Sequence, residues 1–210
     1  MNVTDLIPQV RIVINEMATV EDTFTAEVDT ALRQFLQTAM VQIASMPLYR
    51  GTPATLTGDG SVTWQKRPDG LYYATIKCGE DFLRPLSVIL AGWVRPAHVF
   101  LPVNGRKFLA QYSSAPGIGN GPASPVAFIA KDPDTRIIAH ASKTEGTCEL
   151  RYIPVPKIGD DGELDVPDIY RDALVYTASG LYLQSVNEYD AAKAAFDTAA
   201  SLIEVINQTS

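Results

Sequence analysis

Cysteine and histidine are scarce in this 210-residue sequence, which contains two of each. Cys78 and Cys148 are too few for a disulfide framework, so a reducing, intracellular place of folding is expected. Together with His98 and His140 they could supply zinc ligands, but none of these residues forms a Cys-x-x-Cys or His-x₃-His pair. We therefore expect no metal and no cofactor, and we expect both cysteines to be small core residues in strands.

The sequence also lacks an apolar run long enough to cross a bilayer. Its start, MNVTDLIPQV, is acidic where a signal peptide is basic, and it has no small-residue cleavage site. We therefore expect no membrane contact and no targeting signal.

Basic residues are outnumbered, and the net charge of −7 is unevenly distributed. Residues 1–50 carry −3, residues 51–157 carry +4 and residues 158–210 carry −8. An acidic chain argues against a dedicated nucleic-acid binder, which needs a basic footprint. The asymmetry has two interpretations. Either the solvated faces simply differ, or the basic middle of one copy meets the acidic end of another.

Motifs for catalysis or phosphate binding are missing as well. No Gly-x-Ser-x-Gly elbow nominates a nucleophile, although a Ser-His-Asp arrangement stays open. The glycine-rich residues 117–121 are followed by Pro122 rather than by a helix with free N–H groups, which argues against a phosphate cradle. The acidic residues 160–163 lack the spacing of a calcium loop and fit a solvated linker better. We therefore expect that this protein is not an enzyme.

Two antiparallel helices are predicted at the C-terminal end. Apolar residues recur at steps of three and four over residues 170–182 and again over residues 192–206. The break at residues 186–188 is short, which predicts an αα-hairpin. Asp165 is the expected cap of the first helix, with Pro167 in its first turn.

Two further helices are predicted at the N-terminal end. One apolar stripe covers residues 3–17, with Thr4 or Asp5 as the expected helix cap and Pro8 therefore in the first turn. A longer stripe covers residues 28–43. Helices with one apolar face each bury those faces by packing together. Gly180 and the alanines of residues 191–200 predict that another element packs closely against the C-terminal hairpin.

The middle of the chain has a different pattern, because most of the 14 prolines and a series of short apolar runs lie within residues 51–157. This spacing predicts an antiparallel β-sandwich or a barrel-like sheet. The expected fold is α+β: a discontinuous helical bundle from residues 1–50 and 163–210, with an inserted β-rich domain at residues 51–162. Residues 113–125 are expected to form a long loop, and such loops are usually functional or shaped by a partner. The predicted strands are residues 61–65, 71–77, 86–91, 98–101, 126–130, 136–140 and 147–153.

One passage singles out possible interface residues. Residues 81–96 contain two Arg-Pro dipeptides, and Trp93 and Arg95 lie near the end of a predicted strand. These two side chains could stack as a cation–π pair or anchor an interface, whereas Trp93 could equally be an ordinary core aromatic.

Taken in order along the chain, the features resemble a head-to-tail adaptor of tailed bacteriophages, a connector or neck ring protein of the gatekeeper type. The segments that carry the resemblance are Ala31-Leu-Arg-Gln-Phe35, Asp81-Phe-Leu-Arg84, Ser124-Pro-Val126, Leu150-Arg-Tyr-Ile-Pro154, residues 172–183 and residues 190–195. The resemblance implies a structural virion protein without catalytic residues. It implies a dodecameric ring below the portal, with a conduit for DNA and a docking platform for tail or further neck proteins.

Several residues follow as interface candidates. A conduit should not grip DNA, since each neutralised phosphate adds affinity, so acidic side chains of the helical part are expected to approach the lumen. Either the short polar tail after Ile206 or the last helix is expected to dock against the portal. The predicted interface residues are Trp93, Arg95, Tyr182, Asp190, Asp197 and Glu204.

Other functions remain open from the sequence. The main alternative is a carbohydrate- or receptor-binding β-module of a phage tail, which exposed aromatic residues in the long loop would favour. Tyr112 is the aromatic residue nearest to that loop. A hydrolase is a third option.

Overall fold

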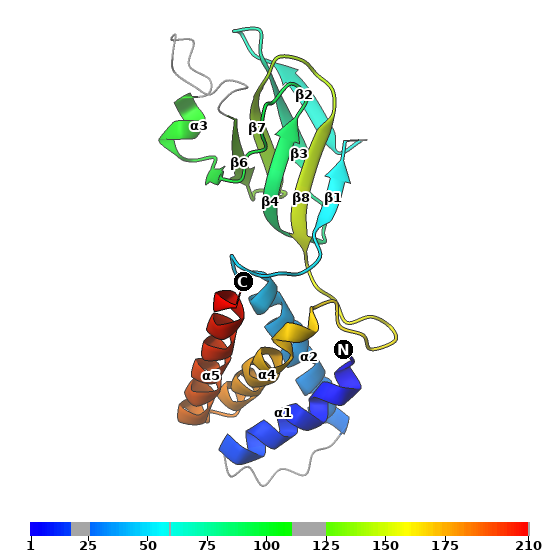
Figure 1. The fold of residues 1–210 in the computed structure, drawn as a ribbon, viewed down its shortest axis with the longest axis vertical. Coiled ribbons are helices and arrows are strands. Elements are labelled where there is room, and N and C mark those ends of the chain that lie inside the picture. Colours follow the sequence, from blue (N-terminus) through cyan, green and yellow to red (C-terminus); the bar gives the residue numbers. More distant parts are fainter. Residues whose placement is uncertain (18–25, 59, 111–124, 210) are drawn as a thin grey trace. The chain divides into compact units, whose positions relative to one another are not determined.

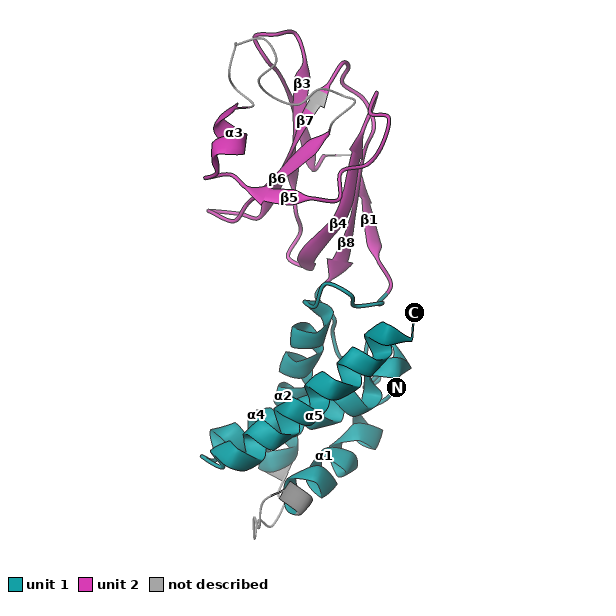
Figure 2. Ribbon diagram, turned by 60° about the vertical axis from the view of Figure 1, so that its left-hand side comes forward, with its two compact units in different colours: residues 1–51, 155–210 teal, residues 52–154 magenta. Residues whose placement is uncertain are grey.

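The computed structural model describes residues 1–17, 26–58, 60–110 and 125–209. The chain forms two compact units, shown in separate colours in Figure 2. Unit 1 comprises residues 1–51 and 155–210, and unit 2 comprises residues 52–154. Helices come from both ends of the sequence and sheets are inserted between them, which confirms the predicted α+β fold.

Unit 1 is a bundle of helices in which α4 is central (Figure 1). Since α1, α2 and α5 all pack against α4, its side chains are buried on more than the one predicted apolar face. Val175, Ser179 and Leu183 are among these additional buried residues. The helices are α1 (Val3–Met17), α2 (Ala26–Ala44), α4 (Arg171–Ser185) and α5 (Tyr189–Gln208).

Helix α1 begins earlier than predicted. The Asn2 side-chain Oδ1 accepts a hydrogen bond from the backbone N–H of Thr4 at 3.0 Å, which is an N-cap contact. Pro8 therefore lies inside the helix rather than in its first turn, where its missing N–H removes one helical hydrogen bond.

Helix α4 begins later than predicted. A 3₁₀ turn, η1 (Asp168–Tyr170), precedes it, so Asp165 does not cap it. The turn places Tyr170 in the core, where its hydroxyl accepts a hydrogen bond from the backbone N–H of Arg50 at 3.1 Å.

The segment leading into η1 is fastened to α2 by one amide. Gln37 Nε2 donates to the Pro156 carbonyl at 2.7 Å, and Gln37 Oε1 accepts from the Ile158 N–H at 3.2 Å. One side chain thus satisfies two backbone groups that would otherwise need water or a strand.

Unit 2 contains two sheets that share one apolar core, in a sandwich-like arrangement that does not close into a barrel. The first sheet, in the order β1-β8-β4, is antiparallel. The second has the order β2-β3-β7-β6-β5, and its last pair is parallel, so the prediction of a wholly antiparallel domain is wrong at β5. The strands are β1 (Ala54–Thr57), β2 (Val62–Lys66), β3 (Tyr72–Lys77), β4 (Phe82–Leu90), β5 (Phe100–Pro102), β6 (Val126–Ala130), β7 (Arg136–Ser142) and β8 (Cys148–Pro154).

Two elements of unit 2 were not predicted: strand β1 and the short helix α3 (Arg106–Ala110). Strand β4 contains Pro85, which a central strand would not tolerate. It lies at an edge of its sheet, and its register shifts between Pro85 and Ser87. The predicted loop at residues 113–125 and the glycine-rich residues 117–121 lie outside the described residues, apart from residue 125. In the described part of the chain, no helix is long and apolar enough to span a membrane.

Candidate interaction surfaces

The predicted acidic residues lie on one face of α5. Asp190, Asp197 and Glu204 are spaced by seven residues, which corresponds to about two helical turns, and all three are exposed. The structure therefore brings these three carboxylates into one stripe on the surface of unit 1. Their role toward DNA or a partner stays a prediction.

Two of the predicted interface aromatics are core residues. Tyr182 is 5% exposed, and its ring meets Phe35 of α2 edge-to-face at 6.2 Å. Trp93 is 7% exposed and belongs to the core of unit 2. Both rings already fill intramolecular sites, so neither can meet a partner without rearrangement of its core.

The two residues that follow Trp93 are exposed. Val94 is 84% exposed and Arg95 is also exposed, at the tip of a loop that follows β4. We call residues 92–97 the Val94 loop. The tip of this loop thus presents one apolar side chain beside one guanidinium to the solvent.

The Val94 loop is held firmly at both ends. Gly92 has a φ of +76°, a left-handed conformation that favours glycine, and the Trp93 N–H donates to the Leu90 carbonyl at 3.0 Å. At the far end, Val88 and Ala97 exchange two backbone hydrogen bonds of 3.0 and 2.8 Å. The buried Trp93 ring thus anchors a loop whose tip is preorganised.

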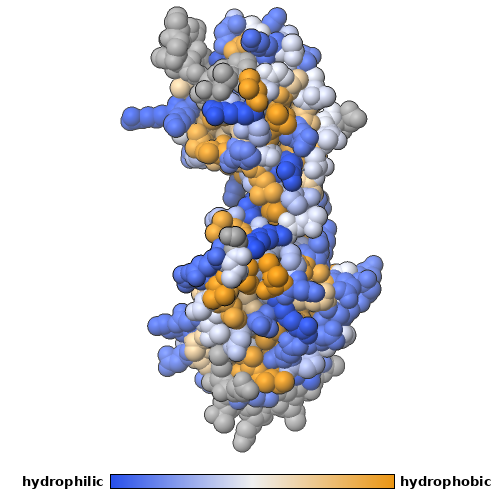
Figure 3. Space-filling model, in the orientation of Figure 1, coloured by the Kyte–Doolittle hydropathy of each residue, from blue (hydrophilic) through white to orange (hydrophobic). Residues whose placement is uncertain are grey.

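A groove of about 470 Å³ runs over α4 between α1 and α5 in unit 1. We call it the α1–α4–α5 groove. Val13 and Val175 are buried at its base, whereas Ile12 is 55% exposed. Figure 3 shows apolar side chains gathered among charged ones on the face of unit 1 turned to the viewer. The described residues that line the groove are Gln9, Ile12, Val13, Asp172, Val175, Tyr176, Thr198 and Leu202.

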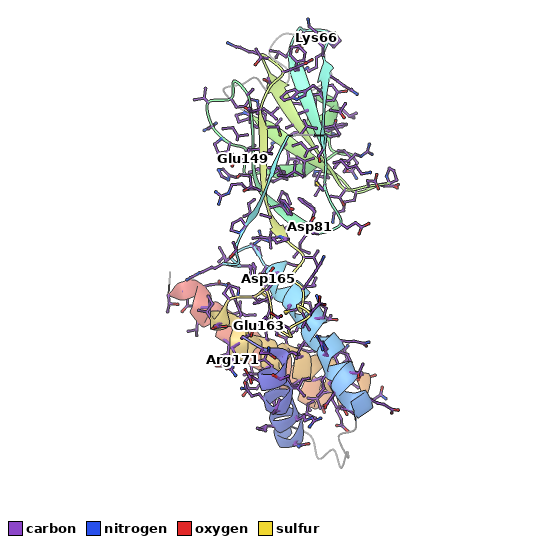
Figure 4. All side chains as sticks on the ribbon, turned by 90° about the vertical axis from the view of Figure 1, so that its right-hand side faces the viewer. Lys66, Asp81, Glu149, Glu163, Asp165 and Arg171 are labelled. Carbon is purple, nitrogen blue, oxygen red and sulfur yellow. The ribbon has the colours of Figure 1, made fainter. Side chains whose placement is uncertain are left out.

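Asp172 is the one carboxylate among the described residues that line the groove, and these residues include no lysine or arginine. The groove lining is therefore negatively charged. Next to Asp172 in sequence, Arg171 Nε donates to Gln9 Oε1 of α1 at 3.4 Å. Figure 4 labels Arg171 at the start of α4. This contact fastens α1 to α4 beside the groove.

A second hollow, of about 790 Å³, lies in unit 2 at the ends of β4 and β8. Its lining is mostly glycine, alanine, threonine and aliphatic residues, with Glu149 as its one charged group among the described residues (Figure 4). The Cys148 thiol also lines this hollow next to Glu149, but burial raises the pKa of Cys148 to about 12. Elsewhere in this unit, Asp81 accepts a hydrogen bond from the Tyr152 hydroxyl at 2.8 Å. This bond links the residue that precedes β4 to strand β8.

The residues first considered as metal ligands are dispersed. Cys78 and Cys148 are buried as free thiols, and burial raises the pKa of each to about 12. His98 is exposed on the surface, whereas His140 is fully buried with its ring stacked on Tyr73 at 5.0 Å. The described residues include no group of three or more His, Cys, Asp or Glu that could hold a metal ion.

The environment of His140 keeps its imidazole neutral. Burial lowers the pKa of His140 to about 4, and the positive charge of Arg67 adds to this effect. Arg67 is itself buried and forms an ion pair with Asp69 at 2.7 Å. These contacts belong to packing rather than to a reactive centre.

Sugar binding would need exposed aromatic rings on which a sugar could stack. Among the described residues of unit 2, the large exposed apolar side chains are the aliphatic Val94, Val99 and Leu109. Tyr112, on which the carbohydrate alternative depended, lies outside the described residues. The described surface therefore gives no support to a sugar-binding site.

Comparison with known proteins adds one match. The family model described as SU10 adaptor protein matches residues 1–210, which spans both helical ends and the inserted sheets. A search of curated proteins found no match.

Proposed function

Because the chain belongs to the SU10 adaptor protein family, and is thus a structural adaptor protein of a bacteriophage, we propose that it forms a ring between the portal of the head and the tail. The ring would contain twelve copies and form part of the virion neck after assembly in the host cytoplasm. The observation that carries the proposal is the family match over the whole chain. The helical residues 1–50 and 163–210 would face the portal, and the inserted residues 51–162 would contribute to the wall.

A ring needs two different complementary surfaces on each copy, because neighbouring copies meet through a heterologous contact. Such a contact gives a closed ring only when the rotations between successive copies add up to a full turn. The chain supplies surfaces of different chemistry: an acidic helical unit with an apolar groove, and a β unit with an exposed, basic loop. Opposite charges at such contacts mainly determine register and the choice of partner.

The lumen would let DNA pass without binding it. We propose that the acidic stripe of Asp190, Asp197 and Glu204 faces this lumen, where carboxylates add no counterion-release affinity for phosphate. Replacing all three by lysine should slow DNA ejection, with the larger delay at low salt. Replacing them by asparagine or glutamine is the matched control and should have little effect. Equal ejection rates for the lysine and the amide variants would exclude this stripe from the lumen.

The function itself is tested in the phage that encodes the chain. Deleting the gene should yield heads packed with DNA that carry no tails, and supplying the chain from a plasmid should restore complete particles. Electron microscopy of lysates distinguishes these states. Normal tailed particles in the deletion would exclude an adaptor role, whereas tailed but non-adsorbing particles would support the receptor-binding alternative.

A further inference from the structure

We propose that the Val94 loop of one copy inserts into the α1–α4–α5 groove of a second copy of this chain. The inference rests on the proposed ring, and it names the two surfaces that join neighbouring subunits. Val94 would lie against Ile12 and Leu202, and the Arg95 guanidinium would pair with the Asp172 carboxylate.

The apolar parts of the two surfaces are complementary. Val94 is the most exposed of the large apolar side chains in the described residues, and Ile12 leaves more than half of its surface in water at the groove. Covering both removes apolar surface from water on each side of the contact. The groove volume lies in the range of concave sites that receive ligand groups, and its base is already formed by the buried Val13 and Val175.

The charges select the loop as the occupant. The groove carries a carboxylate and no basic side chain among its described lining residues, and the Val94 loop carries a guanidinium beside its apolar tip. Residues 158–210, which supply two of the three groove helices, have a net charge of −8, whereas residues 51–157 have +4. A second copy therefore presents an apolar side chain to the apolar part of the groove, together with the basic group that the groove lining lacks.

Another basic and apolar segment of unit 2 was considered. Helix α3 exposes Leu109 together with Arg106 and Lys107, but it is only one five-residue helix. Val94 is the more exposed of the two apolar side chains, at 84% against 68% for Leu109, and it directly precedes Arg95. Leu109 thus serves as the matched control.

The contact is heterologous, because loop and groove are different surfaces of the same chain. Each copy has one of each, so the contact repeats from copy to copy and gives either a closed ring or an open chain. In an isologous dimer the two-fold axis would instead pair both loops with both grooves, so association would stop at two copies.

The test is disulfide trapping with the full chain. Ile12→Cys and Val94→Cys are made in separate chains, mixed and oxidised, so that only a contact between copies can join them. The native Cys78 and Cys148 are buried and should not interfere. We expect a dimer from the mixture, no dimer from either variant alone, and no dimer when Leu109→Cys replaces Val94→Cys. The double variant Ile12→Cys/Val94→Cys should give a ladder of higher oligomers.

A charge exchange makes the result specific. Arg95→Glu in the Val94→Cys chain should slow dimer formation by about threefold or more at low salt, and Asp172→Arg in the Ile12→Cys partner should restore it. Circular dichroism verifies that each variant is folded. No dimer in the mixture, or equal trapping of Leu109→Cys, would overturn the proposal.

Failure of this contact and failure of the adaptor function are distinguishable. If the deletion phenotype is confirmed but Ile12→Cys and Val94→Cys are not trapped, the ring uses other surfaces. If the two cysteines are trapped and the deletion still yields tailed particles, the chain self-associates but is not the adaptor.

Discussion

The ring of Phe196 in α5 lies against Gly180 in α4, so that a Cβ at residue 180 would meet Phe196 Cε1 at 2.8 Å. No real Cβ approaches an atom so closely, so the absence of a side chain at Gly180 is what allows the ring to lie there. The two helices of the C-terminal hairpin therefore pack closely at the point where Gly180 faces the Phe196 ring.

Gly180→Ala should destabilise the chain although alanine is the better helix former. The gain in helix propensity is about 1 kcal/mol, whereas overpacking against the Phe196 ring costs about 1–3 kcal/mol. In a Phe196→Ala background the clash is gone, and the same substitution should then stabilise. Urea unfolding of the four chains measures this change of sign, and the same sign in both backgrounds would contradict the contact.

Gln37→Ala should lower the free energy of unfolding by about 1–3 kcal/mol, because it leaves the Pro156 carbonyl and the Ile158 N–H without this partner. Gln42 of the same helix is exposed, and Gln42→Ala is expected to change stability by less than about 0.5 kcal/mol. Thermal or urea unfolding compares the two. Similar effects would mean that the Gln37 amide does not hold this segment.

His140 should make stability depend on pH in one direction. The unfolded imidazole binds a proton below about pH 6.5, whereas the folded one does so only below about pH 4. Between these values the unfolded state binds more protons, so the free energy of unfolding should fall by as much as about 3 kcal/mol as the pH is lowered. The contribution is fully present above pH 6.5.

His140→Phe removes this titration and keeps an aromatic ring beside Tyr73. Its unfolding free energy should vary less between pH 6.5 and pH 4 than that of the wild type. A wild-type slope in His140→Phe would contradict the assignment.

Cys78 and Cys148 should resist alkylation in the folded chain. Burial raises the pKa of both thiols to about 12, which leaves almost no thiolate at pH 8. Mass spectrometry after treatment with iodoacetamide should detect no adduct without denaturant and two adducts in urea. Rapid modification of the native chain would show that one of these thiols is accessible.

The sequence predicted the elements that depend on hydrophobic periodicity. Leu32, Leu36, Met40 and Ile43 repeat at the helical period and are buried in α2, and the short apolar runs of the middle region became strands. From Gly180 it predicted that another element packs closely against the C-terminal hairpin. It did not predict that α4 is enclosed on most sides, since a small polar residue such as Ser179 gives no apolar signal.

The candidate surfaces were predicted less well than the fold. Trp93 and Tyr182 were selected as aromatic residues, and aromatic rings fill cores as readily as interfaces. The sequence did not single out the exposed Val94, which follows Trp93, or the exposed Ile12. A signal for Ile12 existed, because it is the apolar residue of α1 that falls outside the helical stripe. Exposure of Val94 depends on the Gly92 turn and the Ala97 bridge, which are tertiary features.

The central claim is ring formation at the portal. Electron microscopy of the full chain mixed with the portal protein of the same phage tests it most directly. We expect a closed ring of twelve copies, coaxial with the portal and open at its centre. A chain that stays monomeric and unattached to the portal, or that attaches as an oligomer without a central opening, would contradict it.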